Sequence, residues 1–424
     1  MLKIHEITAE NFRCFKNITF DLNPQLTVFV GKNCSGKSTI LDICSYLLHY
    51  LAIEIQGGRY LYPKDIDITN GSNEINLNYI LSDENANLQD INFTYSIDEF
   101  NRINRKANFN NLTDIKYATL CVYYSSKRIV CNYKRLSESK TSTQSAFENA
   151  FEHDIDFSST MSWFIEKSIE ETLKMRRAKN FNLHIPELDT VRYAVAKSLE
   201  EYDEPYIDGT PPRIFITHKN NPEVPLLFEQ LSDGHRILLA MIMDLARRLI
   251  VANQNFKERT GLEILDAPAI VLIDEIELHL HPAWQQTVLP TLCKLFPNVQ
   301  FIVTTNSPLV ISSIKDEHIR IIDDNKIFNS PQGTWGAEAQ RILTRIFGVD
   351  TRSPSEATDM LNKYADLVYG NKWDSEEALN LREKLNDIYL DSEPLLDRLD
   401  LYIDNKKWQA VCLKDDQYEK YYQK

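Results

Sequence analysis

The chain has 424 residues, of which 43% are hydrophobic, and its formal net charge is −14. This length and apolar content are sufficient for a large hydrophobic core and for two or three structural units. The negative net charge excludes a protein that binds nucleic acid through an overall positive charge. Seven scattered cysteines without a CxxC pair indicate neither a metal cluster nor a disulfide framework, so we expect a reduced, cytoplasmic protein. Charged residues interrupt the longest apolar stretch, 237–252, which predicts an amphipathic helix and no membrane partner.

Residues 1–134 are predicted to form the first half of a nucleotide-binding α/β domain. Two alternating segments and the apolar run LTVFVG predict three strands, and a helix from about Lys37 to Leu51 follows a glycine-rich turn. The polar, asparagine-rich stretch 101–113 predicts a loop. Alternating runs predict an antiparallel side sheet at residues 75–83, 91–98 and 119–126.

Residues 135–204 are predicted to be a helical insertion, with a Ser/Thr-rich linker at 137–145. Asp189 or Thr190 is the predicted cap of its second helix. From 205 to 345 helices and strands alternate, which predicts a parallel sheet in the second half of the same domain. Residues 346–424 are predicted to form an acidic helical extension, whose apolar stripes indicate either core packing or a docking surface.

Residues 31–39, GKNCSGKST, fit the phosphate-loop pattern GxxxxGK[ST] between an apolar strand and a helix. Glycines let backbone N–H groups surround phosphate oxygens, and the helix start adds the positive end of its dipole. We expect Lys37 to contact the β- and γ-phosphates of ATP, and Ser38 to hold Mg²⁺. The other nucleotide-binding candidates in this loop are Asn33, Ser35, Gly36 and Thr39.

A second apolar run, from Ala269 to Ile273, ends in the two carboxylates Asp274 and Glu275. Ligands bind at the carboxyl ends of the strands in parallel sheets. We therefore expect Asp274 to support Mg²⁺ and Glu275 to activate the attacking water as a general base.

A third motif, LSDGHR at residues 231–236, opens an apolar helix upstream of these carboxylates. We expect Ser232 to cap that helix, which leaves its hydroxyl and the first N–H groups available to an anion. Together, the phosphate loop, LSDGHR and IVLIDEIELHLHP (270–282) resemble the ABC-type ATPases of the RecF, SMC and OLD group. The resemblance implies an α/β, ABC-ATPase-like P-loop head with a mixed or parallel sheet and an antiparallel side sheet.

In that group the signature of one subunit closes on the γ-phosphate bound to the other, so the resemblance makes Ser232 and Gly234 nucleotide-binding candidates in trans. Arg13, in the opening IHEITAENFRCF, occupies the position where a basic residue of the group approaches the nucleotide. The segment 276–282 resembles the D-loop at the dimer interface. Its histidines, His279 and His281, are either surface or capping residues or contact the nucleotide.

No glutamine-loop residue is identified, although the stretch 123–128 lies where such a loop is expected. Lys127 and Arg128 either belong to it or are solvated charges. Four segments extend the resemblance over most of the chain to the PtuA-type ATPases of Septu anti-phage systems and Septu-like retrons. They are VYYSSKR (122–128), MSWFIEK (161–167), FEQLSDGHRILLAMIMDLARRL (228–249) and RILTRIFGVDTRSP (341–354).

The PtuA resemblance implies antiviral defence and partnership with an HNH nuclease. The chain has no HNH motif of its own and lacks the acidic toprim pattern of OLD-type proteins, so we expect an ATPase without nuclease activity. One position departs from the group: Asn306 follows the strand 299–305, where a γ-phosphate-sensing histidine is usual. Asn306 donates hydrogen bonds but cannot become a cation near neutral pH. We therefore expect slow ATP turnover, with a barrier about 1–3 kcal/mol higher.

The sequence thus predicts an ATP-controlled regulatory subunit that forms ATP-sandwich dimers, or a higher oligomer, and controls a partner nuclease. Contact with DNA or RNA through the complex is left open. The alternative is a RecF-like repair ATPase that acts directly on DNA, which predicts a basic stripe and salt-dependent binding. The acidity of the chain disfavours it. The ATPase subunit of a transporter is the least favoured, because its motifs differ and it needs a membrane partner.

Overall fold

The computed structural model describes residues 2–56, 62–82, 87–97, 103–109, 119–128, 146–151, 157–199, 201–254, 261–390 and 392–412. The chain divides into two compact units, residues 1–348 and 349–424. The predicted linker at 137–145 lies outside the described residues.

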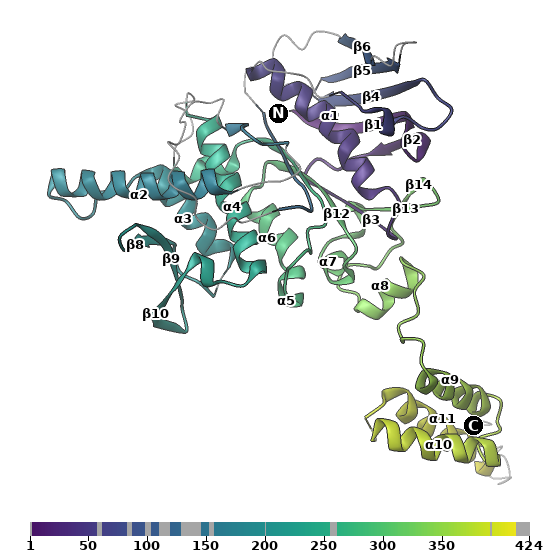
Figure 1. The fold of residues 1–424 in the computed structure, drawn as a ribbon. Helices are drawn as coiled ribbons and strands as arrows, with labels where there is room; N and C mark the ends of the chain where they lie inside the picture. The colour runs from purple at the N-terminus through teal and green to yellow at the C-terminus, as the bar shows by residue number, and fades with distance from the viewer. Residues whose placement is uncertain are drawn as a thin grey trace, which may run out of the picture. The chain divides into compact units, whose positions relative to one another are not determined.

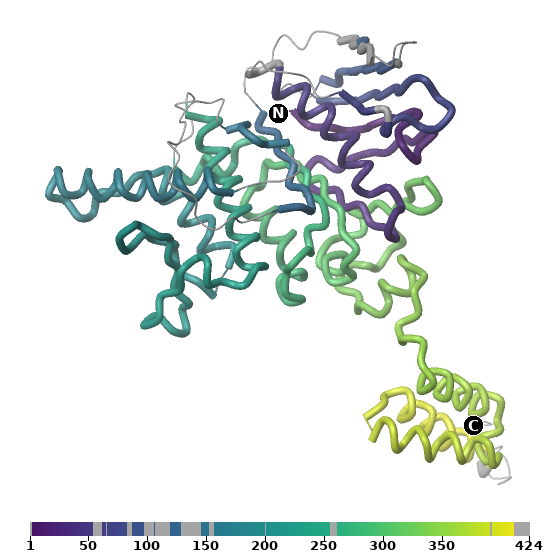
Figure 2. The backbone as a smooth tube through the Cα atoms, in the orientation of Figure 1, coloured from purple at the N-terminus to yellow at the C-terminus, as the bar shows by residue number. Residues whose placement is uncertain are grey.

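A six-stranded sheet forms the centre of the first unit, in the order β14-β13-β3-β12-β11-β7 (Figure 1). Its parallel strands are β3 (Leu26–Gly31), β7 (Leu120–Tyr124), β11 (Ala269–Ile273), β12 (Val299–Thr305) and β13 (Ile319–Asp323), and β14 (Lys326–Asn329) is antiparallel. Figure 2 shows the purple segment of β3 beside the green segments of β12 and β13, although they are far apart in sequence. Every residue of β3, β7, β11 and β12 is buried, which is typical of parallel strands covered on both faces.

The segment 119–126 was predicted to belong to the side sheet, and this prediction was wrong. β7 pairs in parallel with β11 at the edge of the central sheet. All five of its residues are buried, so its signal is a continuous apolar run rather than the alternation of a half-exposed strand. The residues after β7 therefore reach the same sheet edge as those after β3, β11 and β12.

A second, antiparallel sheet has the order β2-β1-β4-β5-β6. Its strands are β1 (Lys3–Phe12), β2 (Phe15–Asp21), β4 (Glu74–Ser82), β5 (Leu88–Ile97) and β6 (Ile103–Phe109). Helix α1 (Lys37–Gln56) shares one core with this sheet and one face of the central sheet. On the side-sheet side, the Tyr79 hydroxyl donates to the Ile43 carbonyl at 2.8 Å, and Tyr46 meets Phe12 edge to face.

The stretch 101–113 was predicted to be a loop, but β6 lies within it and pairs along its length with β5. At the edge of a sheet, backbone hydrogen bonds to a single neighbour hold the strand, and polar residues are compatible with that position. Composition alone therefore gave the wrong assignment here.

The other face of the central sheet is covered by helices that share a second core. They include α2 (Ser158–Ala178), α3 (Pro186–Ser198), α4 (Asp233–Ala252) and α6 (Val288–Leu295). Helix α3 begins at Pro186, one turn before the predicted cap at Asp189 or Thr190, because the fixed φ of proline suits the first helical position. A small sheet, β10-β9-β8, comprises β8 (Tyr206–Asp208), β9 (Arg213–His218) and β10 (Asn221–Leu227).

Short elements complete the first unit: α5 (Pro282–Gln285), α7 (Pro308–Ser312), α8 (Ala339–Arg345), and the 3-10 turns η1 (Asp65–Asp67), η3 (Phe228–Gln230), η4 (Gly261–Asp266) and η5 (Asp316–His318).

The second unit consists of α9 (Glu356–Tyr369), α10 (Glu376–Tyr389) and α11 (Pro394–Cys412) around a core of its own. Leu361, Leu381 and Leu385, from the predicted apolar stripes, are buried in that core, as the core-packing alternative expects. Among the described residues of the whole chain, no helix has the length and apolar character needed to cross a membrane.

Candidate nucleotide-binding site

The loop of residues 31–39 joins the end of β3 to the start of α1. Gly36 has a φ of 99°, and a Cβ there would lie 2.6 Å from the Phe15 ring, so a larger residue would displace that ring. Cys34 also adopts a positive φ, of 64°. The Ser35 hydroxyl is buried and has no hydrogen-bond partner within the described structure. This curled backbone and unused hydroxyl fit a bound chain of phosphates.

Lys37 lies inside this loop. Its ammonium group donates to the carbonyl oxygens of Gly31 and Lys32, each at 2.9 Å. Burial lowers the pKa of Lys37, and the carboxylates within residues 274–277 oppose that shift. The positive charge of Lys37 is therefore held between the loop and the acidic segment that follows β11.

Asp274, at the end of β11, connects three elements. The Ser38 hydroxyl, at the start of α1, donates to its carboxylate oxygens at 3.0 and 3.3 Å. The Thr304 hydroxyl of β12 donates to the same carboxylate at 2.6 Å and accepts from the Glu275 N–H at 2.8 Å. A hydroxyl and a carboxylate in contact at the end of a phosphate loop are the donor set expected for Mg²⁺. Thr304 was not identified from the sequence.

Glu275 follows directly and has a left-handed backbone, with a φ of 47°. Its side chain is partly exposed. Burial, together with the neighbouring charges of Asp274 and Glu277, raises its pKa above the ordinary value. A carboxylate with a raised pKa at the mouth of the site is suited to accept a proton from water.

Arg128 supports these acidic residues from the end of β7. Its guanidinium donates to the backbone carbonyls of Asp274 and Glu275, each at 2.9 Å. Burial lowers the pKa of Arg128 to about 10, so it stays charged at neutral pH. Arg128 is only 6% exposed, which excludes the solvated-charge alternative, whereas its neighbour Lys127 is exposed. The continuous apolar run before Arg128 indicates a buried strand, but only the folded sheet shows that this strand lies beside β11.

Asn306, after β12, lies between the acidic segment and the phosphate loop. Its backbone N–H donates to Glu277 at 2.7 Å, and its amide donates to the Asn33 side chain at 3.4 Å. The Thr305 hydroxyl donates to the other oxygen of Glu277 at 2.7 Å. Glu277 thus fixes the turn that presents Asn306, a role that the sequence did not reveal.

The signature residues lie at the start of α4. Ser232 is exposed and caps the helix by accepting from the His235 N–H, as predicted. Gly234 is buried, and a Cβ there would lie 2.2 Å from the His279 carbonyl, so the signature packs against the 276–282 segment of its own chain. Among the described residues, no hydrogen bond or ion pair joins Ser232 or Gly234 to the phosphate loop.

Two further predicted residues lie nearer to α1. Arg13, with a φ of 48°, donates to Asp42 of α1 at 2.5 Å and to Asp67 of η1 at 2.8 Å. These carboxylates raise its pKa against the effect of burial. The Thr39 side chain is buried at the start of α1.

His281 caps α5 by accepting from the Ala283 N–H, as the capping alternative expects.

A protein-family model described as "AAA domain, putative AbiEii toxin, Type IV TA system" matches residues 26–312. The chain is 27% identical to the "Retron Ec83 probable ATPase" of Escherichia coli, over 98% of this chain and 89% of that one. It is 24% identical to the "Septu protein PtuA" of Bacillus thuringiensis, over 84% of this chain and 86% of the relative. The SMC head domain of Thermotoga maritima aligns with a TM-score of 0.41 and 12% identity, over 78% of this chain and 99% of that domain.

Proposed function

This chain belongs to the family described as an AAA domain, putative AbiEii toxin, Type IV TA system, and on this premise we propose that it is the ATP-hydrolysing subunit of an anti-phage defence complex. Its likeness over most of the chain to a retron probable ATPase and to a Septu PtuA supports this assignment. The observation that carries it is the meeting of Lys37, Ser38 and the Asp274–Glu275 pair at one edge of the central sheet.

The residues at this edge have separate roles in the transfer of the γ-phosphoryl group to water. Lys37 supplies a positive charge to the β- and γ-phosphates. Ser38 and Asp274 would hold Mg²⁺, which when bound would neutralise charge on the phosphate oxygens. Glu275 accepts the proton of the attacking water, and Asn306 donates a hydrogen bond toward the γ-phosphate.

A second subunit completes each site in this proposal. Ser232 caps α4 and is exposed, so its hydroxyl and the first N–H groups of the helix are accessible to a nucleotide on another copy. Gly234 sets the signature against the His279 carbonyl. Closure of a dimer around ATP would therefore move the signature and the 276–282 segment together.

ATP binding then controls a separate nuclease, of the HNH type in Septu systems. The two subunits respond to ATP only if one dimer geometry binds ATP more tightly than another. The partner nuclease responds to the geometry of the dimer. The partner, rather than this chain, cleaves the DNA.

Equilibrium ATP binding and steady-state hydrolysis test the proposal. Lys37→Ala should lose ATP binding, because the phosphates lose their counter-charge. Glu275→Gln should bind ATP with the wild-type affinity and lose hydrolysis, because an amide cannot accept the proton. Lys294→Ala is the matched control, since Lys294 is exposed on α6 away from the site. Normal hydrolysis by Glu275→Gln would contradict the assignment of the general base.

A further inference from the structure

Although the chain is acidic as a whole, the tip of the α2–α3 hairpin is positively charged. We name residues 174–181 the basic finger. The wider segment 172–186 contains four cations and no Asp or Glu, in a chain of net charge −14. Lys174 pairs with Glu170 at 2.7 Å. The other three are exposed and have no carboxylate partner among the described residues: Arg176, Arg177 and Lys179.

The basic finger projects from the helical layer of the first unit. The buried residues of α2 end at Glu171, and the rest of the helix, 172–178, has none. In Figure 1 the labelled helix α2 extends away from the central sheet. Positive charge near a helix C-terminus is favourable by itself, so charge alone does not define a binding surface.

Two further features indicate a surface that meets a ligand. Lys179 occupies the left-handed position that ends α2, with a φ of 50°, where glycine or asparagine usually lies. A lysine there keeps its charge at a conformational cost that glycine would avoid. Phe181, in the adjoining turn, is 85% exposed. An aromatic ring beside exposed cations is the combination that binds strands with unpaired bases.

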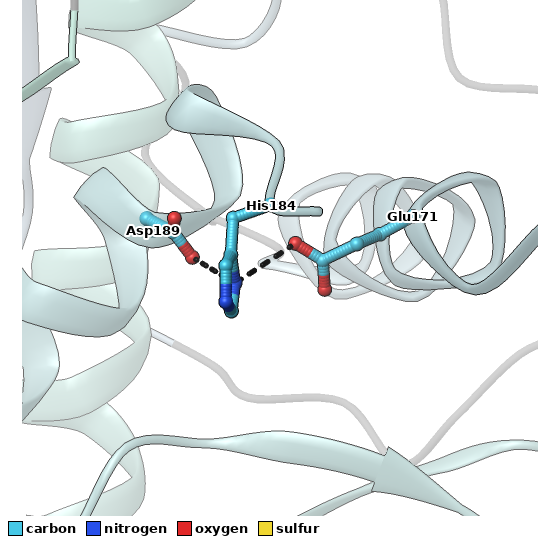
Figure 3. Close-up of side chains that lie close together, drawn as sticks. All are labelled: Glu171, His184 and Asp189. Carbon is cyan, nitrogen blue, oxygen red and sulfur yellow. Dashed lines mark ion pairs between the residues drawn. The ribbon is translucent and has the colours of Figure 1, made fainter. Parts of the chain in front are cut away.

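A polar clasp fixes the base of the basic finger (Figure 3). Glu171 accepts from Arg192 at 2.8 Å and from the Ile185 N–H at 2.9 Å, which ties the start of α3 to α2. His184 lies 3.8 Å from Glu171 and 3.6 Å from Asp189. Although these three could hold a metal ion, Arg192 already bonds both carboxylates, so we interpret the group as a clasp. The tip is therefore presented by a fixed base.

We propose that the basic finger is a contact site for single-stranded nucleic acid. Arg176, Arg177 and Lys179 bind phosphates of the strand, and Phe181 stacks on an unpaired base. A duplex offers the phosphates but not the base faces, so the aromatic ring selects a single strand. This contact is separate from the nucleotide site and does not depend on ATP hydrolysis.

Fluorescence anisotropy with a labelled oligothymidylate, and with a duplex of equal length, tests the electrostatic part. The triple variant Arg176→Glu, Arg177→Glu, Lys179→Glu should lose at least about tenfold in single-strand affinity at low salt, and the slope of log K against log[salt] should flatten by about two. The control Arg213→Glu, Lys326→Glu, Lys384→Glu makes the same change in net charge at exposed sites elsewhere and should bind nearly as the wild type.

Phe181→Ala tests the stacking part. It should weaken single-strand binding about fivefold or more without changing the salt slope, and Phe181→Tyr should retain binding. Equal affinities of the triple variant and its control would overturn the proposal. The proposal would also be overturned if the wild-type chain bound neither oligonucleotide. That conclusion would stand even if the triple variant lost binding to an acidic protein partner. ATPase rates should be unaltered in all these variants, so a failed finger leaves the proposed function standing.

Discussion

Arg128 connects the strand β7 to the acidic end of β11 through two backbone carbonyls. The carbonyl of Glu275 is one of them, and Glu275 itself is in a left-handed conformation. We expect Arg128→Ala to leave ATP binding within about threefold but to lower kcat at least about tenfold, because charge-assisted hydrogen bonds that position the base are lost. Lys127→Ala, at the exposed neighbouring position, should behave as the wild type. Equal kcat values for the two variants would exclude a positioning role.

The charge of Glu277 acts on Glu275 as well as on the turn at Asn306. Glu277 is one of the causes, after burial and Asp274, that raise the pKa of Glu275. A general base must be deprotonated, so activity should fall as the pH drops through this raised pKa. Glu277→Gln removes one negative charge and should move the acid limb of kcat/KM to lower pH. A pH–rate profile of both proteins measures this shift. An acid limb at the same pH in both proteins would show that the titration of Glu275 does not cause it.

The resemblance to the RecF, SMC and OLD group implies a histidine at the position of Asn306. Its amide reaches the Asn33 side chain and its backbone is anchored by Glu277, so a histidine there would start from the same backbone. We expect Asn306→His to raise kcat about tenfold or more, through a charge-assisted contact worth about 1–3 kcal/mol. Asn306→Ala should lower kcat further. Fast turnover in the wild type, with no gain in the histidine variant, would show that the residue at position 306 does not limit the rate of ATP hydrolysis.

The site residues that the sequence located belong to local patterns. Lys37 and Ser38 follow a strand and open a helix, and Asp274 and Glu275 end an apolar run, so each is visible within a short window. Thr304 and Arg128 act only because their strands flank β11. No local window contains the strand order, and their roles therefore emerged only from the folded sheet.

At the scale of elements, the docking of α4 on the 276–282 segment depends on a glycine. Gly234→Ala would place a methyl group 2.2 Å from the His279 carbonyl, a contact that backbone cannot accept without moving. We expect a loss of about 1–3 kcal/mol of stability, or a displaced signature with reduced ATPase activity. Thermal unfolding and steady-state rates measure both. Asp233→Ala, at the neighbouring position, removes the ion pair between the exposed Asp233 carboxylate and Arg236; it is the control and should change both quantities much less.

A buried polar network holds the second half of the same helix. Asp244 of α4 accepts from Tyr124 of β7 at 2.9 Å and from Thr160 of α2 at 2.6 Å, and it pairs with Arg248 at 2.6 Å. Burial would raise the pKa of Asp244, but Arg248 and Arg247 together lower it to about 2. A network of this kind stabilises one arrangement of its members. The network therefore connects helix α4, the insertion helix α2 and the strand β7, which precedes Arg128.

Element predictions succeeded where periodicity matched burial and failed where tertiary context decided. The central strands β3, β11 and β12 are buried throughout and were correctly predicted. β7 carries the same signal, yet its neighbours in sequence are side-sheet strands, and its place in the sheet was wrong. β6 is polar and was predicted to be a loop, because its pairing with β5 has no signature within its own residues.

For the whole molecule, the central prediction is that each ATP is clasped by the phosphate loop of one copy and the signature of another. Lys37→Ala and Ser232→Glu should each abolish hydrolysis alone, the first by removing the phosphate counter-charge and the second by placing a carboxylate against the γ-phosphate. In a heterodimer, however, the intact loop of the Ser232→Glu copy faces the intact signature of the Lys37→Ala copy. One working site results, and an equimolar mixture that exchanges subunits should recover roughly a quarter of the wild-type rate.

A matched mixture separates this arrangement from simple subunit stabilisation. Lys37→Ala mixed with Glu275→Gln should recover nothing, because each substitution damages the half-site that its own copy forms with the phosphate loop and Glu275. Each heterodimer then has a defect in both of its ATP sites. The measurement is the ATPase rate of each mixture against the sum of its components. Recovery in both mixtures, or in neither, would contradict a site shared between Ser232 of one copy and Lys37 of its partner. Recovery in the first alone requires that shared site, because no single copy in that mixture contains both intact halves.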